Sequence, residues 1–590
     1  MSTTPDVEVA SSGLDHVSLH SLEPEIIIIG AGVIGCALAY SLSQSGRKVV
    51  LLERDLSEPD RIVGELLQPG GVAALEQLGM QDVLDGIDAV PVEGYCIVSG
   101  ENQVGCPYPL LEEMAGLPSP PSSSSSIDTS TVVSKEEAAQ VSDEKTWIDK
   151  KGKWHVESTS GKKEGRSFHH GKLISSLRRK VLQNCKGVTV LEATVKDLVF
   201  CEHTNRVIGI SASFKPSTSS STPTSTFTST STSNGTSDET NTNQTGPTTT
   251  SSNGMVRKLY APITIIADGC FSRFRLTPGT RTPTPKTRSH FVGIIVENCK
   301  LPIQNMGTVC LTPQGPVLLY QIGNQNGEIR MLVDVKGKLP SVGDGSLKRL
   351  IEEKYVPHLP ATLQQPVLTS LATQRLRSMP NTFLPPSIQG LSSTLSGAIL
   401  CGDAYNMRHP LTGGGMTVAF NDAIILTEKL KPSPELPAGR DGLENWDVVG
   451  DKLREWFWER KKLSGVVNVL SMALYSLFGG ADEPELEVLR EGCVKYLGMG
   501  GERVAGPVGL LSALTPAPFM LFYHFFSVAF YSIFLLLIKG PPNSSLRNNK
   551  GLSNPLLVLL SLPLNLIYSI KVFWTACVVL LPVIYTEFRI

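Results

Sequence analysis

The chain lacks the cysteine patterns that would indicate a metal or redox site. Its 590 residues include 11 cysteines, an odd number, and no two of them form a Cys-x-x-Cys pair. That absence excludes zinc ribbons and thioredoxin-type redox motifs, and no metal site is predicted. Single, scattered cysteines are typical of reduced and buried thiols, which favours the cytosolic side of a membrane.

Strong charge of one sign and an N-terminal apolar run are also missing. The formal net charge is −2 and the basic residues form no long run, so no nucleic acid is expected as a partner. No apolar run precedes Ile26, and a secretory signal peptide is therefore not expected. Any membrane contact is predicted to come from the C-terminal part of the chain.

One segment carries a dinucleotide-binding pattern. An apolar strand is predicted at Ile26–Ile29, and Gly30-Ala31-Gly32-Val33-Ile34-Gly35 follows it and opens a helix that reaches about Ser43. The first glycine permits a tight turn, the second lets the backbone approach a pyrophosphate, and the third lets the helix pack closely. A second strand at 48–52 ends in Glu53, whose carboxylate can accept hydrogen bonds from ribose hydroxyls. This pattern alone does not separate FAD from NAD(P).

Three motifs further along the chain favour a flavin. Asp268 follows the apolar run Ile265–Ala267, and Gly402-Asp403 ends the apolar run that starts at Ala398. The glycine-rich run Gly413-Gly414-Gly415-Met416 then precedes a helix predicted at 418–430. In this order the motifs resemble those of the aromatic-hydroxylase-like flavoproteins, which implies FAD as the cofactor. In that family the second Asp binds the ribityl chain, and the positive end of the glycine-rich helix faces the isoalloxazine.

Several runs resemble one family more closely, the squalene monooxygenases (squalene epoxidases) of fungal type. They are Gly64–Gly71, His169–Gly171, Phe383–Pro386, Gly402–Thr417 and Val504–Leu511. The resemblance covers about residues 24–110, 166–215 and 255–590. It implies an FAD-dependent monooxygenase that converts squalene and O2 into (S)-2,3-epoxysqualene, an early oxygenation step of sterol (ergosterol) biosynthesis. It also implies that electrons come from NADPH through a cytochrome reductase, in agreement with the lack of a second Gly-x-Gly-x-x-Gly motif.

The resemblance assigns site residues as well. It implies FAD contacts for Val33, Ile34, Glu53, Arg54, Arg61, Leu66, Arg178, Val195, Asp403 and Met416. The motifs add Gly30, Gly32, Gly35, Asp268, Gly402, Gly413, Gly414 and Gly415 to the predicted cofactor site. Tyr95 and Gln68 match positions near the flavin and are the predicted catalytic residues; nothing local marks Tyr95 or Val195.

The C-terminal part of the chain predicts contact with a lipid bilayer. No Asp, Glu, Lys or Arg occurs from Val504 to Ile538, and Phe519–Ile538 is long enough to cross a bilayer as a helix. A second apolar run, Pro555–Thr586, is interrupted by Pro563 and Pro582. A pair of buried core helices is the alternative reading of both runs.

Charge between the two apolar runs bears on their topology. The connecting segment carries Lys539, Arg547 and Lys550 and no acidic residue. If both runs spanned the bilayer, this segment would face the cytosol and the catalytic domain the lumen, away from cytosolic NADPH. We therefore expect helices that lie in one leaflet of the endoplasmic reticulum membrane, with the domain cytosolic and lipid droplets as an additional location.

The predicted fold class is α/β, with a Rossmann-like FAD-binding domain, an interleaved β-sheet substrate domain and a C-terminal helical membrane-associated region. The predicted division is 1–24 disordered leader, 25–110 FAD-binding domain, 111–165 insertion, 166–215 FAD-binding domain, 216–253 Ser/Thr-rich disordered insertion, 254–280 FAD-binding domain, 281–395 substrate domain, 396–435 FAD-binding domain, 436–503 helical region and 504–590 membrane-associated helices.

Other functions remain open at this point. A membrane-associated flavin-dependent prenyl-lipid reductase, an aromatic hydroxylase or another lipid hydroxylase would share the fold. A halogenase is disfavoured because Trp456-Phe457-Trp458 lacks the Ile-Pro of the halogenase signature. A non-catalytic sensor or scaffold is disfavoured because Asp403 and the Gly413–Gly415 turn are present.

Overall fold

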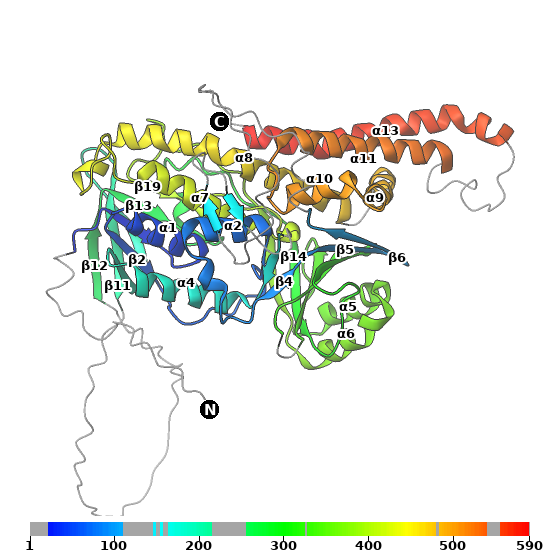
Figure 1. Ribbon diagram of the computed structural model, residues 1–590, viewed down its shortest axis with the longest axis horizontal. Helices are drawn as coiled ribbons and strands as arrows, with labels where there is room; N and C mark the ends of the chain where they lie inside the picture. Colours follow the sequence, from blue (N-terminus) through cyan, green and yellow to red (C-terminus); the bar gives the residue numbers. More distant parts are fainter. Residues whose placement is uncertain are drawn as a thin grey trace, which may run out of the picture.

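The computed structural model describes residues 22–109, 146–148, 154–156, 163–214, 255–324, 327–479, 483–539 and 555–588. The predicted Ser/Thr-rich insertion 216–253 lies outside the described residues. Most of the predicted leader 1–24 and of the predicted insertion 111–165 lies outside them as well. The described part shows two sheets and a layer of helices along one side (Figure 1).

The first sheet has seven strands in the order β12-β11-β10-β2-β1-β13-β19. Their bounds are β1 (Ile26–Ile29), β2 (Val49–Glu53), β10 (Val188–Phe200), β11 (Val207–Phe214), β12 (Met255–Tyr260), β13 (Ile263–Ile266) and β19 (Ala398–Leu400). The five strands from β10 to β19 are parallel, which brings their carboxyl ends to one edge. All four residues of β1 are buried, as expected for a parallel strand covered on both faces.

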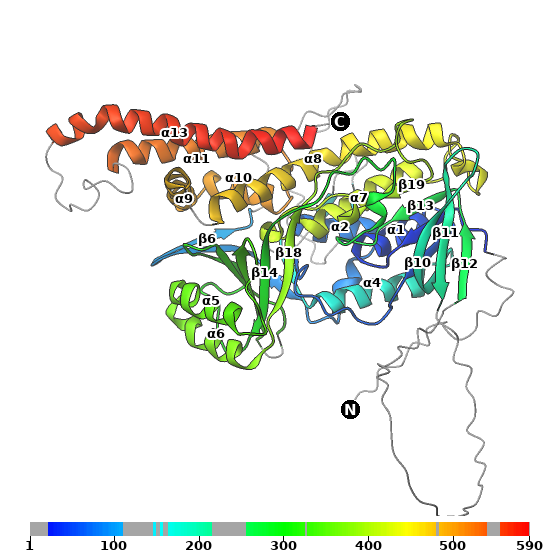
Figure 2. The same ribbon diagram turned by 180° about the vertical axis from the view of Figure 1, so that it is seen from behind.

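A group of helices in mutual contact packs beside this sheet, with α1 directly on β1, β2 and β10 (Figures 1 and 2). They are α1 (Val33–Gln44), α2 (Pro69–Leu78), α4 (His170–Asn184) and α7 (Gly415–Leu430). The predicted strand and helix around the first glycine motif are confirmed to within a residue. Helix α7 begins three residues earlier than predicted, because the glycines before it adopt turn conformations that lead directly into the helix.

The second sheet has the order β18-β14-β17-β16-β15-β5-β6. Its strands are β5 (Gly94–Ser99), β6 (Asn102–Pro107), β14 (Lys286–Val296), β15 (Met306–Leu311), β16 (Pro316–Gln321), β17 (Ile329–Lys336) and β18 (Arg377–Phe383). Helices α5 (Ser346–Lys354) and α6 (Ala361–Thr373) pack on one face. Alternate residues of β5 point to opposite faces, so Cys96 and Val98 pack towards α5 and α6, whereas Ile97 packs on the other side.

This sheet corrects one predicted boundary. Residues 25–110 were assigned wholly to the FAD-binding domain, but β5 and β6 belong to the second sheet. The reason is that β5 pairs in parallel with β15, which is far away in the sequence, and no local pattern reveals such a partner. The rest of the domain division stays a prediction.

Smaller elements complete the core. A three-stranded sheet joins β3 (Leu66–Leu67), β9 (Gly165–Ser167) and β4 (Val90–Val92), and β7 (Thr146–Ile148) pairs with β8 (Trp154–Val156). Short 3-10 helices lie at η1 (Gln81–Leu84), η2 (Phe274–Leu276), η3 (Val356–His358), η4 (Gly402–Ala404), η5 (Pro410–Thr412) and η6 (Asp441–Leu443).

Five helices form the C-terminal layer: α8 (Trp446–Phe478), α9 (Pro484–Leu497), α10 (Glu502–Leu511), α11 (Pro518–Lys539) and α13 (Pro555–Phe588). Both views show α11 and α13 side by side as a long hairpin whose final turn returns to α8 (Figures 1 and 2). Helix α13 is continuous, although Pro563 and Pro582 interrupt the apolar run in the sequence. Each proline removes one backbone donor, and the packing of α13 on its neighbours maintains the helix.

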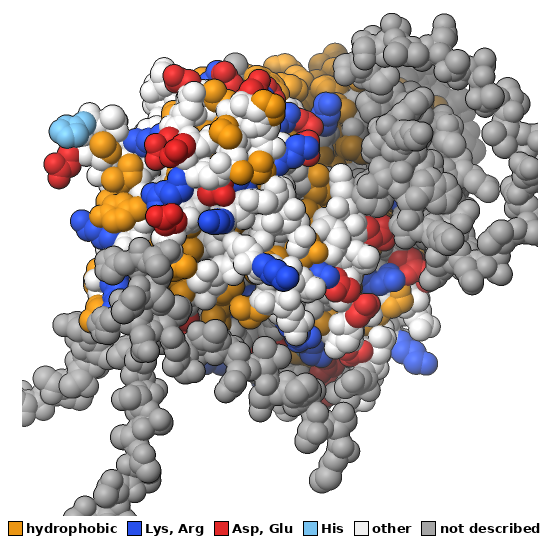
Figure 3. All heavy atoms as spheres, turned by 60° about the vertical axis from the view of Figure 1, so that its left-hand side comes forward, with side chains coloured by type: hydrophobic (Ala, Val, Ile, Leu, Met, Phe, Trp, Pro, Cys, Tyr) orange, Lys and Arg blue, Asp and Glu red, His pale blue; other side chains and the backbone are white. Residues whose placement is uncertain are grey.

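Helices α11 and α13 of the hairpin expose many apolar side chains. Residues 518–538 and 565–588 are long and apolar enough to cross a membrane, and most of their length is not buried. Phe530 is 60% exposed and Trp574 69% exposed. By contrast, acidic and basic side chains are interspersed on the face shown in Figure 3. The exposed apolar hairpin supports membrane association of this part of the chain.

Candidate active site

A cavity of about 800 Å³ lies between the two sheets and is called the large cavity below. Its wall includes the turns that follow β1, β13 and β19, together with residues of β15, β16 and β17. The carboxyl edge of a parallel sheet is the usual place for a nucleotide cofactor. The fold therefore places the three predicted flavin motifs around one space.

The first glycine turn leaves room for a phosphate. Gly30 has φ +103°, and a Cβ there would lie 2.5 Å from the carbonyl oxygen of Ala267. A Cβ at Gly35 would lie 1.8 Å from the carbonyl oxygen of Gly30, so the helix can approach the turn only without a side chain. A Cβ at Gly32 would meet nothing within 4 Å. The open space before the N-terminus of α1 fits a pyrophosphate, which free N–H groups and the helix dipole would bind.

Glu53 is held by the same turn. Its Oε2 accepts a hydrogen bond from the backbone N–H of Ala31 at 2.8 Å. Arg178 donates from Nε to the carbonyl oxygen of Ala31 at 3.0 Å and lies 3.5 Å from the Glu53 carboxylate. Carboxylate oxygens have further lone pairs, so Glu53 can still accept hydrogen bonds from a ribose. The geometry fits the adenosine end of FAD.

Asp403 lies on the short helix η4, where Gly402 has φ +59° and a Cβ would meet Ile34 at 2.7 Å. The Asp403 side chain is exposed to the large cavity but otherwise surrounded by protein. Burial raises the pKa of the Asp403 carboxyl, and nearby arginines, Arg408 first among them, act in the opposite direction. A carboxylate in this position fits the hydroxyl groups of a ribityl chain.

Asp268 has an unused acceptor beside the same space. Its Oδ1 is buried and has no hydrogen-bond partner among the described residues. Burial also raises the pKa of the Asp268 carboxyl. Buried polar atoms in folded proteins are almost always hydrogen-bonded, so this oxygen fits a site that a polar ligand completes.

The glycine-rich turn Gly413–Gly415 places the N-terminus of α7 at the large cavity. Gly413 has φ +63°, Gly414 is the N-cap of α7, and Gly415 and Met416 line the cavity. A Cβ at Gly414 would lie 2.5 Å from Val467 of α8, so this glycine allows α7 and α8 to pack closely. The N-terminus of α7 carries partial positive charge, which suits the electron-rich edge of a reduced flavin.

The two predicted catalytic residues take different positions. Tyr95 lines the large cavity, and its hydroxyl is buried with no hydrogen-bond partner among the described residues. Burial raises the pKa of the Tyr95 phenol well above its ordinary value, so the group stays neutral and can act only as a hydrogen-bond donor or acceptor. Gln68 does not line the cavity; it donates to the carbonyl oxygen of Thr412 at 2.8 Å and accepts from Tyr108 at 2.8 Å. Its contacts make it a support for the turn before α7.

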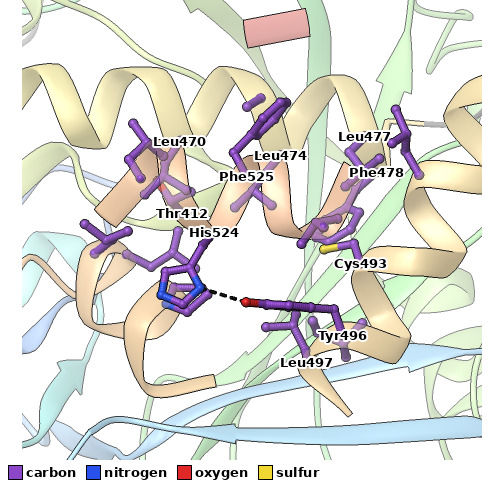
Figure 4. A pocket seen from close by; sticks show the side chains of 18 of the residues that line it. Thr412, Leu470, Leu474, Leu477, Phe478, Cys493, Tyr496, Leu497, His524 and Phe525 are labelled. Atoms are coloured by element: carbon purple, nitrogen blue, oxygen red, sulfur yellow. Dashed lines mark hydrogen bonds between the residues drawn. The ribbon is translucent and has the colours of Figure 1, made fainter. Parts of the chain in front are cut away.

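A second space, called the apolar pocket below, has a volume of about 130 Å³ and lies among β5, β15 and helices α8–α13. Its described lining contains no Asp, Glu, Lys or Arg. Figure 4 shows leucine and phenylalanine side chains converging on it from α8, α9 and α11, with His524 and Tyr496 joined by a 3.0 Å hydrogen bond. An apolar lining of this kind fits a hydrocarbon.

The two spaces share a wall of three residues, Tyr95, Val309 and Leu411. We call this wall the window. A hydrocarbon chain whose end lies at the window in the apolar pocket would therefore lie next to a cofactor bound in the large cavity. This adjacency is the arrangement that a flavin enzyme acting on an apolar substrate needs, because the reacting atoms must meet away from water.

The structure brings nearly all of the predicted cofactor residues together. Those that line the large cavity are Gly30, Gly32, Val33, Ile34, Glu53, Arg54, Arg61, Leu66, Arg178, Val195, Asp268, Gly402, Asp403, Gly413, Gly415 and Met416. Gly35 and Gly414 do not line it, because both serve helix packing.

Sequence reasoning missed other residues at this site. Glu65 is buried in the cavity wall and binds Arg330 of β17 through two hydrogen bonds of 2.8 and 2.9 Å. Glu65 and Leu411 stand inside runs that were already marked by the family resemblance, so those runs were the available signal. Val309 carries no local signal, because only the pairing of β15 with the distant strand β5 brings it here.

Comparison with known proteins identifies the relatives of this chain. The family model described as squalene epoxidase matches residues 260–548, and that of FAD dependent oxidoreductase matches residues 25–59. The squalene epoxidase erg1 of Aspergillus fumigatus is 37% identical over 100% of this chain and 99% of its own length. The squalene monooxygenase of Mus musculus is 35% identical over 96% of this chain and 78% of its own length.

Solved structures agree at the level of the fold. The p-nitrophenol 4-monooxygenase of Pseudomonas putida has a TM-score of 0.54 at 13% identity, covering 84% of this chain and 98% of that one. Klebsiella pneumoniae HpxO, solved with FAD and uric acid, has a TM-score of 0.53 at 15% identity, covering 84% and 97%. These similarities show that the chain has the fold of flavin monooxygenases.

Proposed function

The chain belongs to the squalene epoxidase family, and from that premise we propose how its two internal spaces divide the work of the reaction. It is an FAD-dependent monooxygenase that epoxidises squalene with O2, a step of sterol biosynthesis. Bound FAD supplies the chemistry that activates O2 and delivers one oxygen atom to the substrate. The residues of the chain bind both partners, align them and exclude water.

FAD is assigned to the large cavity. The turn at Gly30–Gly35 binds the pyrophosphate, Glu53 and Arg178 hold the adenosine end, and Asp403 binds the ribityl chain. The N-terminus of α7 faces the flavin ring. The open space at Gly32 and the unused oxygen of Asp268 are the observations that support this fit.

Squalene is assigned to the apolar pocket, with one terminal alkene at the window. The observation that carries this assignment is the shared wall of Tyr95, Val309 and Leu411 between a polar space and an apolar one. Tyr95 then offers a neutral hydroxyl at the point where the oxygen is transferred.

The hairpin of α11 and α13 is proposed to lie in the cytosolic leaflet of the endoplasmic reticulum membrane, with lipid droplets as an additional location. Its exposed aromatic and aliphatic side chains favour immersion, and the pocket beneath it would receive squalene directly from the lipid. A cytosolic NADPH–cytochrome reductase is proposed as the electron donor, since a single dinucleotide fingerprint occurs in the sequence.

The test is a labelled-oxygen assay. Detergent-solubilised protein with FAD, NADPH and a cytochrome reductase is incubated with squalene under isotopically labelled O2, and the products are analysed by mass spectrometry. We expect one labelled atom in 2,3-epoxysqualene and loss of the product with Asp403→Ala. A reducible bound flavin without epoxide would contradict the assignment of squalene and favour a prenyl-lipid reductase. Full activity of D403A would contradict the placement of FAD.

A further inference from the structure

The final turn of α13 inserts a carboxylate into the protein interior. Glu587 is 2% exposed, and its Oε2 accepts a hydrogen bond from Nζ of Lys461 on α8 at 2.9 Å. Its Oε1 accepts from Nδ2 of Asn468, also on α8, at 2.9 Å. The otherwise apolar hairpin is therefore fastened to the body of the enzyme by a buried ion pair and a buried hydrogen bond.

Asn468 connects this carboxylate to the wall of the large cavity. Its Oδ1 accepts from Nε of Arg408 at 2.6 Å. The Arg408 guanidinium also donates to Oδ1 of Asn406 at 2.8 Å and to the carbonyl oxygen of Gly415 at 3.4 Å. Arg408, Asn406 and Gly415 all line the cavity. An unbroken series of hydrogen bonds thus runs from the end of α13 to the first residue of α7.

The negative charge of Glu587 compensates one of several buried positive charges in this region. Three cations are buried along this part of α8 and the loop before α7, namely Arg408, Arg460 and Lys461. Arg460 is paired with Asp422 through hydrogen bonds of 2.9 and 2.7 Å. The carboxylate that the structure gives to Lys461 is that of Glu587. Removing one member of a buried pair leaves an uncompensated charge, which strongly destabilises the arrangement around it.

We propose that Glu587 is a positioning residue for the flavin site. By binding Lys461 and Asn468, it sets the position of Arg408 and of the α7 N-terminus, and it thereby couples the seating of the membrane hairpin to the affinity for FAD. The inference rests on FAD occupying the large cavity, as proposed above. The proposal gives Glu587, at the end of the lipid-facing helix α13, a role in the proposed FAD site, with α8 between the two.

The test measures FAD affinity on the full-length protein in detergent, by titrating FAD into flavin-free enzyme and following flavin fluorescence. Glu587→Gln removes the charge that Lys461 requires, and it weakens the hydrogen bond that Asn468 donates, because a neutral amide oxygen is a poorer acceptor than a carboxylate. We expect the Kd for FAD to rise about tenfold and the visible absorption bands of the bound flavin to shift, because Arg408 moves. Glu455→Gln is the matched control, since this α8 carboxylate pairs with Lys429 at the surface; it should leave both readouts unchanged.

A double-mutant cycle separates coupling from simple loss of stability. Asn468→Leu interrupts the series while leaving the Glu587–Lys461 pair, so adding E587Q to N468L should raise the Kd for FAD no further. Glu587→Asp keeps the charge on a shorter side chain and should recover part of the affinity. The proposal is overturned if E587Q and E587D lower the melting temperature while the Kd and the flavin bands keep their wild-type values.

Asp403→Ala distinguishes failure of this inference from failure of the flavin assignment. If the large cavity does not bind FAD, both D403A and E587Q leave the Kd unchanged. If the cavity binds FAD and the coupling is wrong, D403A raises the Kd and E587Q does not.

Discussion

The large cavity and the apolar pocket share three residues, yet they are made in opposite ways. The large cavity is lined by backbone turns, carboxylates and guanidinium groups that sit at the ends of parallel strands, where short motifs place them. The described lining of the apolar pocket comes from helices α8, α9, α10, α11 and α13, the turn at η5 and strands β5, β6 and β15, most of which are far apart in the sequence. Cofactor binding is thus encoded locally, whereas substrate binding depends on how distant parts of the chain are assembled.

The largest effect is expected from closing the window between the two spaces. Val309→Trp places an indole where the hydrocarbon must reach the cofactor, and kcat/KM should fall about a hundredfold. The Kd for FAD should rise much less than kcat/KM falls, since Val309 also lines the large cavity but belongs to none of the flavin motifs. Steady-state epoxidation and FAD titration measure the two effects.

Leu486→Trp is the matched control for that variant. Leu486 lines the apolar pocket but does not belong to the window. Its replacement should raise KM more than it lowers kcat. Equal losses of kcat in V309W and L486W would show that the window is not where the two spaces communicate.

A smaller effect is expected from removing the Tyr95 hydroxyl at the window. Tyr95→Phe removes a buried group that has no partner among the described residues, and kcat should fall about thirtyfold if that group hydrogen-bonds during oxygen transfer. The melting temperature should stay the same or rise, because an unsatisfied buried hydroxyl is lost. Thermal unfolding beside single-turnover kinetics measures this. A fall in stability with unchanged kcat would assign Tyr95 a purely structural role.

Titration should distinguish the two spaces because, among the described lining residues, Asp and Glu occur only in the wall of the large cavity. Burial raises the pKa of Asp403, so the carboxyl gains a proton at a higher pH than an ordinary aspartic acid. Since a protonated carboxyl accepts hydrogen bonds less well, the Kd for FAD should rise as pH falls through that raised pKa. Asp403→Asn should bind FAD about tenfold more weakly at neutral pH and show no such pH dependence. A wild-type Kd that is constant from neutral to mildly acidic pH would contradict this role.

The smallest effect concerns the hairpin that covers the apolar pocket. Trp574→Ser removes an exposed aromatic side chain from α13 and should weaken binding to phospholipid vesicles about fivefold. Trp458→Ser is the control, because Trp458 is exposed by 44% and belongs to α8 and to neither helix of the hairpin. Vesicle flotation measures the bound fraction. Equal losses in both variants would indicate general surface hydrophobicity and not a membrane face.

The difference between local motifs and long-range packing explains which parts of the fold and of the site could be predicted from the sequence. The turns at Gly30–Gly35 and Gly413–Gly415 were found because their requirements are local: a positive φ, a close contact or an open space. Tyr95 was predicted only through family resemblance, since nothing in its neighbourhood distinguishes it. Val309 was missed because it reaches the site through the pairing of β15 with β5 across a long stretch of chain. The position of β5 was predicted wrongly for the same reason.

The place of the apolar pocket under the hairpin has a kinetic consequence. A substrate that enters from the lipid is sampled in two dimensions, so the enzyme responds to the mole fraction of squalene in the bilayer and not to its amount per volume of solution. Adding inert phospholipid at constant total squalene should therefore slow the reaction by surface dilution alone.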